Sequence, residues 1–98
     1  VVHYINDVIG DMDEMGTGDY SFEDHAKHWG EMKGFALGFQ FSPHSPLSSD
    51  DFAAFHTLVG TAPVLAGGDL TAYEDALLEA RDLLQAAYGF DADNVSGW

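Results

Sequence analysis

The chain lacks cysteine, has few basic residues and contains no long hydrophobic run. The absence of cysteine excludes disulfide cross-links and thiolate metal sites. Only 3 of the 98 residues are lysine or arginine, against 17 aspartates and glutamates, so the formal net charge is −14. Nucleic acids and anionic membranes are bound through clustered basic side chains, whereas Lys27, Lys33 and Arg81 are scattered. We therefore predict no nucleic-acid partner and, without an apolar run of about 18 residues, no transmembrane segment.

The sequence nevertheless contains enough apolar material for one core. Hydrophobic residues make up 46% of the chain and aromatic residues 13%, which excludes wholesale disorder. A chain of this length forms one domain at most. It opens on Val1 without a methionine, and we expect it to be a trimmed or processed piece of a longer protein. Residues 1–98 are thus predicted to form a single helical domain or a fragment of one.

Apolar residues recur at helical spacing in four segments, and no segment shows the sustained alternation of a strand. The predicted fold class is therefore all-α, a bundle of about four helices, with a turn-like acidic tail from residue 90 onward. Helix starts are indicated where a serine or threonine precedes an acidic residue by three positions, and a glycine marks the end of a helix. These starts are Ser21 with Asp24, Ser48 with Asp51, and Thr71 with Glu74, the clearest of the three; Gly60 and Gly89 mark ends.

The second predicted helix, within residues 20–41, carries two unusual faces. One face is apolar and aromatic, and from Phe35 to Phe41 the helix is apolar nearly all round, which predicts a single buried rod enclosed on more than one side. The other face repeats a glycine every four residues, at Gly30, Gly34 and Gly38. Glycines inside a helix are costly, so we interpret them as a smooth surface against which another helix packs closely, in preference to room for a ligand.

Acidic and histidine side chains form a stripe on the same helix. Asp24, His28 and Glu31 are spaced i, i+4 and i+7 and so share one face. Imidazole and carboxylate groups are ligands that divalent and ferric ions accept. His3 and Asp7, at i and i+4 on the first helix, are the other candidate ligands. The alternative is that these groups only hydrogen-bond one another and water.

The remaining histidines and the known catalytic motifs give little support to an enzyme. His25 and His56 lie on apolar faces and are predicted to be core residues, while His44 lies between two prolines in a loop that we expect to be exposed. No cysteine nucleophile, G-x-S-x-G elbow, phosphate-binding loop or H-E-x-x-H motif is present. His25-x-x-His28 is the nearest approach to a hydrolytic metal motif.

Several stretches resemble a family of bacterial secreted proteins of unknown function that is grouped with the imelysin-like proteins. The similar stretches are residues 20–43, 45–52 and 87–91. The resemblance implies the C-terminal part of a larger imelysin-like helical domain, exported to the periplasm, the outer membrane or the cell exterior. Several imelysin-like proteins are linked to iron uptake, and their hallmark is a Gly-x-His-x-x-Glu motif. His28 and Glu31 match its histidine and glutamate, while Ala26 stands where the glycine would be.

Two functional hypotheses follow from the residues and the resemblance together. The first is an extracytoplasmic binding protein, associated with uptake, that holds an iron-like divalent or ferric ion. The alternative is a metal-free module that recognises a protein or saccharide through its aromatic and glycine faces. The expected partner is the missing N-terminal part of the same protein or another subunit. Peptidase activity has been attached to the name of the group, but no nucleophile or complete metal-hydrolase set supports it here.

Overall fold

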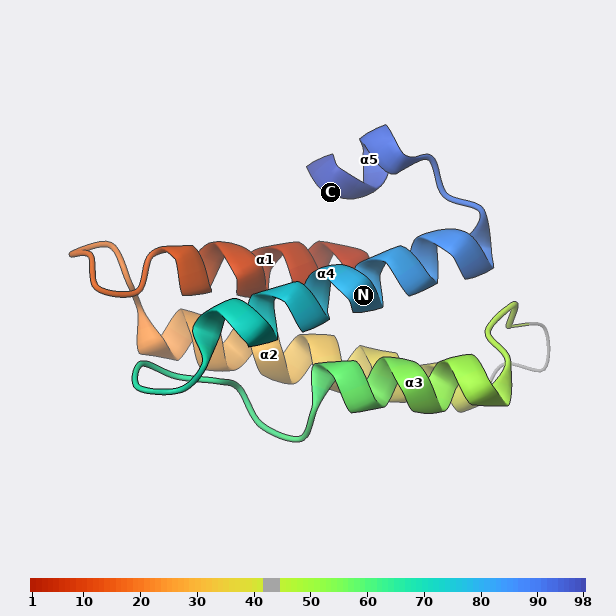
Figure 1. The fold of residues 1–98 in the computed structure, drawn as a ribbon, viewed down its shortest axis with the longest axis horizontal. Helices are drawn as coiled ribbons and strands as arrows, with labels where there is room; N and C mark the ends of the chain where they lie inside the picture. Colours follow the sequence, from red (N-terminus) through yellow and green to blue (C-terminus); the bar gives the residue numbers. More distant parts are fainter. Residues whose placement is uncertain (42–44) are drawn as a thin grey trace.

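Helices provide all the regular secondary structure in residues 1–41 and 45–98, the part of the chain that the computed structural model describes. This confirms the all-α prediction. The predicted loop around His44, between two prolines, lies partly outside those residues, and the expected exposure of His44 lies outside them. The elements are α1 (Val2–Asp13), α2 (Phe22–Leu37), the 3₁₀ turn η1 (Gly38–Phe41), α3 (Ser49–Val59), α4 (Leu70–Tyr88) and α5 (Ala92–Gly97) (Figure 1).

The four longer helices form a bundle. α1 packs against α2 and α4, α3 packs against α4, and the short α5 contacts α1 and α4. Each consecutive pair, α1 with α2 and α3 with α4, runs in opposite directions (Figure 1). The resulting body measures 43 × 28 × 20 Å. Short connections between helices favour such antiparallel neighbours.

The helix ends are fixed mostly by the predicted residues. The Ser21 hydroxyl accepts a hydrogen bond from the Asp24 N–H at 3.2 Å, and the Ser48 hydroxyl accepts one from the Asp51 N–H at 3.1 Å. Gly89 ends α4 in the left-handed conformation, with φ 70°. The predicted cap at Thr71 is wrong. Asp69 caps α4 instead, because its carboxylate accepts a hydrogen bond from the Ala72 N–H at 3.0 Å, which leaves Thr71 inside the first turn.

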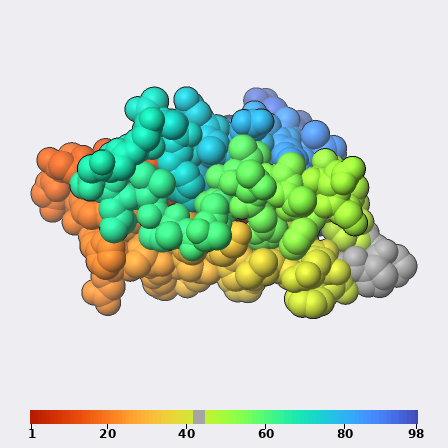
Figure 2. Space-filling view, turned by 60° about the horizontal axis from the view of Figure 1, so that its bottom comes forward, coloured from red at the N-terminus to blue at the C-terminus, as the bar shows by residue number. Residues whose placement is uncertain are grey.

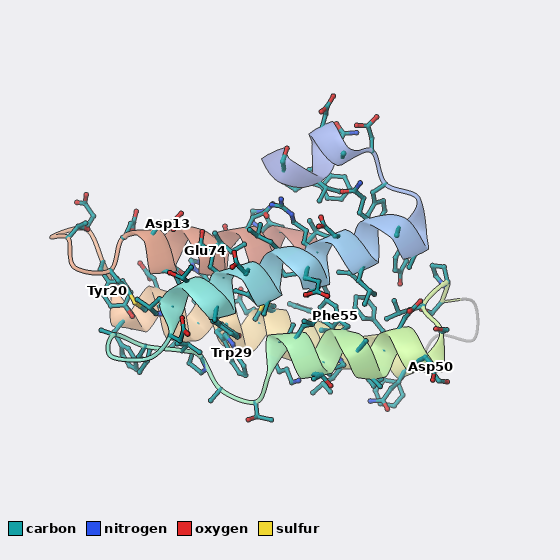
Figure 3. The ribbon with its side chains drawn as sticks, in the orientation of Figure 1. Asp13, Tyr20, Trp29, Asp50, Phe55 and Glu74 are labelled. Carbon is teal, nitrogen blue, oxygen red and sulfur yellow. The ribbon has the colours of Figure 1, made fainter. Side chains whose placement is uncertain are left out.

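The core lies between the inner faces of the four longer helices. Phe55 is its largest fully buried side chain, and it projects from α3 toward α4 (Figure 3). Its ring meets the Phe39 ring edge-on at a centroid distance of 5.9 Å. The buried hydrophobic residues are Val2, Ile5, Val8 and Met12 on α1, Met32 and Ala36 on α2, Phe55 and Val59 on α3, Tyr73, Leu77, Ala80 and Leu84 on α4, and Val95 on α5.

The prediction that residues 20–41 form one enclosed rod is wrong. The α-helix ends at Leu37 and gives way to η1. Phe22, Phe35 and Phe41 remain 58, 60 and 79% exposed. One face of α2 is buried as the periodicity predicts, with His25, Met32 and Ala36 fully covered. The face that carries the glycines has no covering element among the described residues.

The glycine face of α2 does not receive a helix, so the predicted close packing is also wrong for this chain. A Cβ placed at Gly30, Gly34 or Gly38 would have no described atom within 4 Å, apart from its own helix and chain neighbours. In Figure 2, α2 runs along the lower edge of the molecule with no other segment beyond it. The physical reason is that α1 packs against α2, Trp29 on α2 contacts α4 through Tyr73, and α3 packs on α4 and not on the glycine face.

The tail also differs from its prediction. Instead of a turn, residues 92–97 form α5, which Asp91 caps by accepting a hydrogen bond from the Asp93 N–H at 2.9 Å. Val95 is buried, and Asn6 on α1 donates to the backbone oxygens of Val95 and Trp98 at 2.9 and 2.8 Å. A six-residue helix with a single buried side chain is too short to show helical periodicity in the sequence.

A buried chain of hydrogen bonds links α2, α4 and α3. The Trp29 indole N–H donates to the Tyr73 hydroxyl at 2.7 Å, and that hydroxyl donates to the Val59 carbonyl oxygen at 2.6 Å. Tyr73 is only 9% exposed, and burial raises the pKa of its phenol, so the hydroxyl keeps its proton. One side chain thus satisfies two polar groups from two neighbouring helices.

We predict that Tyr73→Phe destabilises the protein by about 1–3 kcal/mol, because it leaves the Trp29 N–H and the Val59 carbonyl without their partner. Chemical denaturation followed by circular dichroism measures the change. Tyr88→Phe is the matched control, since the Tyr88 hydroxyl makes only a 3.4 Å contact with Ser45, and we expect it to cost less than about 0.5 kcal/mol. Equal losses in the two variants would contradict this role of Tyr73.

Candidate functional site

The antiparallel pairing of α1 and α2 brings the predicted ligand residues onto one side of the molecule. We call this surface the acidic strip. α1 contributes its histidine and acidic side chains at intervals of four residues, and α2 contributes the predicted stripe. The members of the acidic strip are His3, Tyr4, Asp7 and Asp11 on α1, and Asp24, His28 and Glu31 on α2.

His28 and Asp11 make the closest polar contact in the acidic strip. The His28 Nδ1 and the Asp11 Oδ2 lie 2.6 Å apart, and their side chains are 28 and 14% exposed. An ionised carboxylate only accepts hydrogen bonds, so Nδ1 carries the proton and donates it to Asp11. Within the described residues, the other ring nitrogen, Nε2, has no hydrogen-bond partner.

The surroundings of His28 favour its protonated form. The hydrogen bond to Asp11 raises the pKa of His28, and its burial opposes this effect. The negative charges of Asp11, Asp7 and Asp24 raise the pKa further. The same charges would attract a cation to Nε2 once the proton has left, so a metal ion and a proton compete for one site.

The other predicted ligands surround His28 without forming a complete coordination shell. Glu31 lies near Tyr4, whose pKa is raised chiefly by the Glu31 charge, and Asp24 is exposed one turn before His28. His3 contacts Asp7 through its Nε2 at 3.2 Å, with its side chain 65% exposed. Among the described residues, no three histidine or acidic side chains are grouped closely enough to hold a metal ion together.

The two histidines predicted to be core residues are held by hydrogen bonds. His25 is fully buried and shares a 2.8 Å hydrogen bond with the Tyr20 hydroxyl through Nδ1, which confirms its core assignment, while its buried Nε2 has no partner among the described residues. His56 is half-buried; its Nδ1 accepts from Lys33 at 2.8 Å, and its Nε2 donates to the Ala36 carbonyl at 3.3 Å. Burial lowers the pKa of both histidines, and the Lys33 charge lowers that of His56 further.

Sequence reasoning missed Asp11 as the partner of His28. Asp11 continues the i, i+4 series that begins at His3 and Asp7, so the antiparallel hairpin of α1 and α2 could have indicated it. A second missed feature is the pair of carboxyl groups of Asp13 and Glu74, which lie on facing helices (Figure 3). Burial raises the pKa of Glu74, and the charge of Asp13 raises it further. No spacing within one helix could have shown a contact between α1 and α4.

No protein-family model, curated protein or solved structure gives a significant match to this chain. The acidic strip therefore has to be interpreted from its own geometry. None of the described helices is long and apolar enough to cross a membrane.

We predict that Asp11→Asn lowers the pKa of His28, because it removes the carboxylate that accepts from Nδ1. Titration of the His28 ring protons by NMR measures this directly. A raised folded-state pKa stabilises the protein fully below about pH 6.5, and this stabilisation is lost as the pH rises through the folded-state pKa. The variant should therefore lose more stability relative to the unsubstituted protein at pH 5.5 than at pH 8.

Asp50→Asn is the control for that titration. Asp50 is exposed in the first turn of α3, at the opposite end of the molecule from Asp13 (Figure 3). Its substitution should leave the pKa of His28 unchanged. A His28 pKa that is the same in Asp11→Asn and the unsubstituted protein would show that the 2.6 Å contact does not form in solution.

Proposed function

We propose that this chain is a helical binding module that holds a divalent or ferric metal ion at His28 and Glu31. The observation that carries the proposal is the Asp11–His28 hydrogen bond. Metal-binding histidines characteristically donate their second ring N–H to a carboxylate, which orients the ring and raises the basicity of the ligating nitrogen. Asp11 supplies that carboxylate at 2.6 Å and leaves Nε2 for the ion.

The remaining coordination positions would be filled by Asp24, by water and, after a change of rotamer, by Asp7. His3 would then serve as the partner of Asp7, with which it is already in contact at 3.2 Å. The net charge of −14 favours a cationic ligand over an anionic one. Cysteine is absent, so the donor set consists of nitrogen and oxygen, which suits iron, zinc and copper ions.

The cellular role in this proposal rests on the resemblance to the imelysin-like proteins. His28 and Glu31 occupy the histidine and glutamate positions of their Gly-x-His-x-x-Glu motif. On that basis the module belongs to an exported bacterial protein, in the periplasm, on the outer membrane or outside the cell, and serves metal uptake. The first predicted partner is the remainder of the same protein.

Isothermal titration calorimetry with Zn²⁺, Cu²⁺ and, without oxygen, Fe²⁺ tests the metal site. We expect saturable binding that is abolished in His28→Gln and weakened in Glu31→Gln. Affinity should also fall as the pH drops through the raised pKa of His28, since the proton and the metal ion compete for the imidazole. Asp50→Asn is the control for a lost surface charge. Metal binding that has the same affinity in His28→Gln as in the unsubstituted protein would refute the proposal.

The exposed rings of α2 and η1 support the alternative, a metal-free interaction module. Phe35 and Phe41 are 60 and 79% exposed, and the glycine face beside them is uncovered by any described residue. Exposed aromatic rings on neighbouring helical elements are typical of a surface that a partner covers. For this chain, the candidate partners are the rest of the same protein and another subunit.

Light scattering coupled to gel filtration tests whether another subunit covers this face. If it does, the protein is oligomeric, and the double variant Phe35→Ser with Phe41→Ser is monomeric, because burial of the two rings no longer drives association. Leu65→Ser, which removes a hydrophobic side chain that is 39% exposed in the loop before α4, is the control and should remain oligomeric. A monomeric unsubstituted protein would exclude self-association through α2.

A further inference from the structure

A second candidate binding site lies at the end of the bundle where α1 begins and α4 ends. A cavity of about 280 Å³ opens there between the start of α1, η1, the last turns of α4 and the C-terminal segment. α4 continues past the first residue of α1 in the structure (Figure 1). The cavity shares only His3 with the residues of the proposed metal site.

Four of the eight residues that line the cavity carry phenylalanine, tyrosine or tryptophan rings. Tyr88 stacks on Phe90 at a centroid distance of 5.3 Å, and Phe90 meets Trp98 edge-on at 5.0 Å. Phe39 approaches Tyr88 from η1 at 6.2 Å. These four rings are therefore continuous around the cavity, and they come from three separate parts of the chain.

The rest of the lining offers little hydrogen bonding. Val2 and Leu84 are buried aliphatic side chains of the core. Among the polar groups of the lining, the Tyr88 hydroxyl contacts the Ser45 hydroxyl at 3.4 Å and the His3 ring contacts Asp7 at 3.2 Å. Binding of a ligand would replace water in the cavity with apolar contacts. Few groups of the lining could pair with a charge on the ligand.

We propose that this cavity binds a small uncharged aromatic molecule of one or two fused rings. The size follows from the volume: an apolar cavity of about 150 Å³ is known to hold benzene, and drug-sized ligands occupy roughly 300–1,000 Å³. The chemistry follows from the wall, because aromatic rings stack and meet edge-on with one another. An anionic aromatic molecule is disfavoured, since the chain carries a net charge of −14.

Nuclear magnetic resonance of the two tryptophan indole N–H groups tests this proposal with an internal control. Trp98 lines the cavity, whereas the Trp29 N–H donates to Tyr73 between α2 and α4. Added indole should shift the Trp98 signal saturably and leave the Trp29 signal in place. Indole-3-acetate, which adds a negative charge to the same rings, should bind more weakly. Tryptamine, which adds a positive charge, should not bind more tightly than indole.

Two variants of η1 separate the cavity from general hydrophobic binding. Phe39→Ala removes a ring from the wall and should weaken indole binding by about threefold to tenfold. Phe41→Ala makes the same change on an exposed ring outside the wall and should leave the affinity unchanged. If Phe39→Ala does not fold, Phe90→Leu replaces a ring of the wall with an apolar side chain and should weaken binding in the same direction.

Three results would overturn the proposal. The first is the absence of a saturable shift at Trp98, or an equal shift at Trp29. The second is tighter binding of tryptamine than of indole, which would make the cavity a site for organic cations held by ring faces. The third is an equal loss of affinity in the Phe39 and Phe41 variants.

Discussion

The buried hydroxyl of Tyr73 joins three helices of the bundle. It accepts from Trp29 on α2 and donates to the last residue of α3, while its own ring is part of α4. Burial holds the pKa of this phenol above its ordinary value, so it stays a donor as well as an acceptor. Packing of apolar side chains tolerates small slides of one helix along another, but a pair of hydrogen bonds of 2.7 and 2.6 Å does not. Tyr73 therefore aligns α2 with α4.

The alignment of α2 also determines where the acidic strip lies. His28 and Trp29 are consecutive, so their side chains leave the helix about 100° apart. Because Trp29 is directed at α4, His28 is directed at α1, where the Asp11 carboxylate accepts its hydrogen bond. The same rotation turns the glycines away from every described helix. The rotation of α2 about its axis thus turns His28 of the acidic strip toward α1 and leaves the glycine face uncovered by the described residues.

The sequence predicted properties that depend on one helix and failed where two elements meet. Helical periodicity found the four longer helices and placed His25 in the core, because each signal repeats along a single segment. It failed for the enclosure of residues 20–41, since spacing shows that a face is apolar but not whether another element covers it. The pairing of His28 with Asp11 was missed for a similar reason: it joins residues 17 positions apart on two helices.

The acidic strip and the cavity meet at one residue, His3, and their ligands are opposite in kind. The strip suits a cation, because Asp7, Asp11 and Asp24 raise the pKa of His28 by their charge, and the cavity suits an uncharged ring, because its wall is apolar.

His3 contacts Asp7 and also borders the cavity, so an ion that draws Asp7 away would release the His3 ring. The side chain of His3 is 65% exposed, however, and an exposed pair of this kind contributes at most about 1 kcal/mol. Any coupling between the two sites is therefore weak, and by linkage it acts equally in both directions. The proposed metal ion and the proposed aromatic ligand thus bind to different surfaces of one bundle. A negative binding result for one ligand therefore does not contradict the proposal for the other.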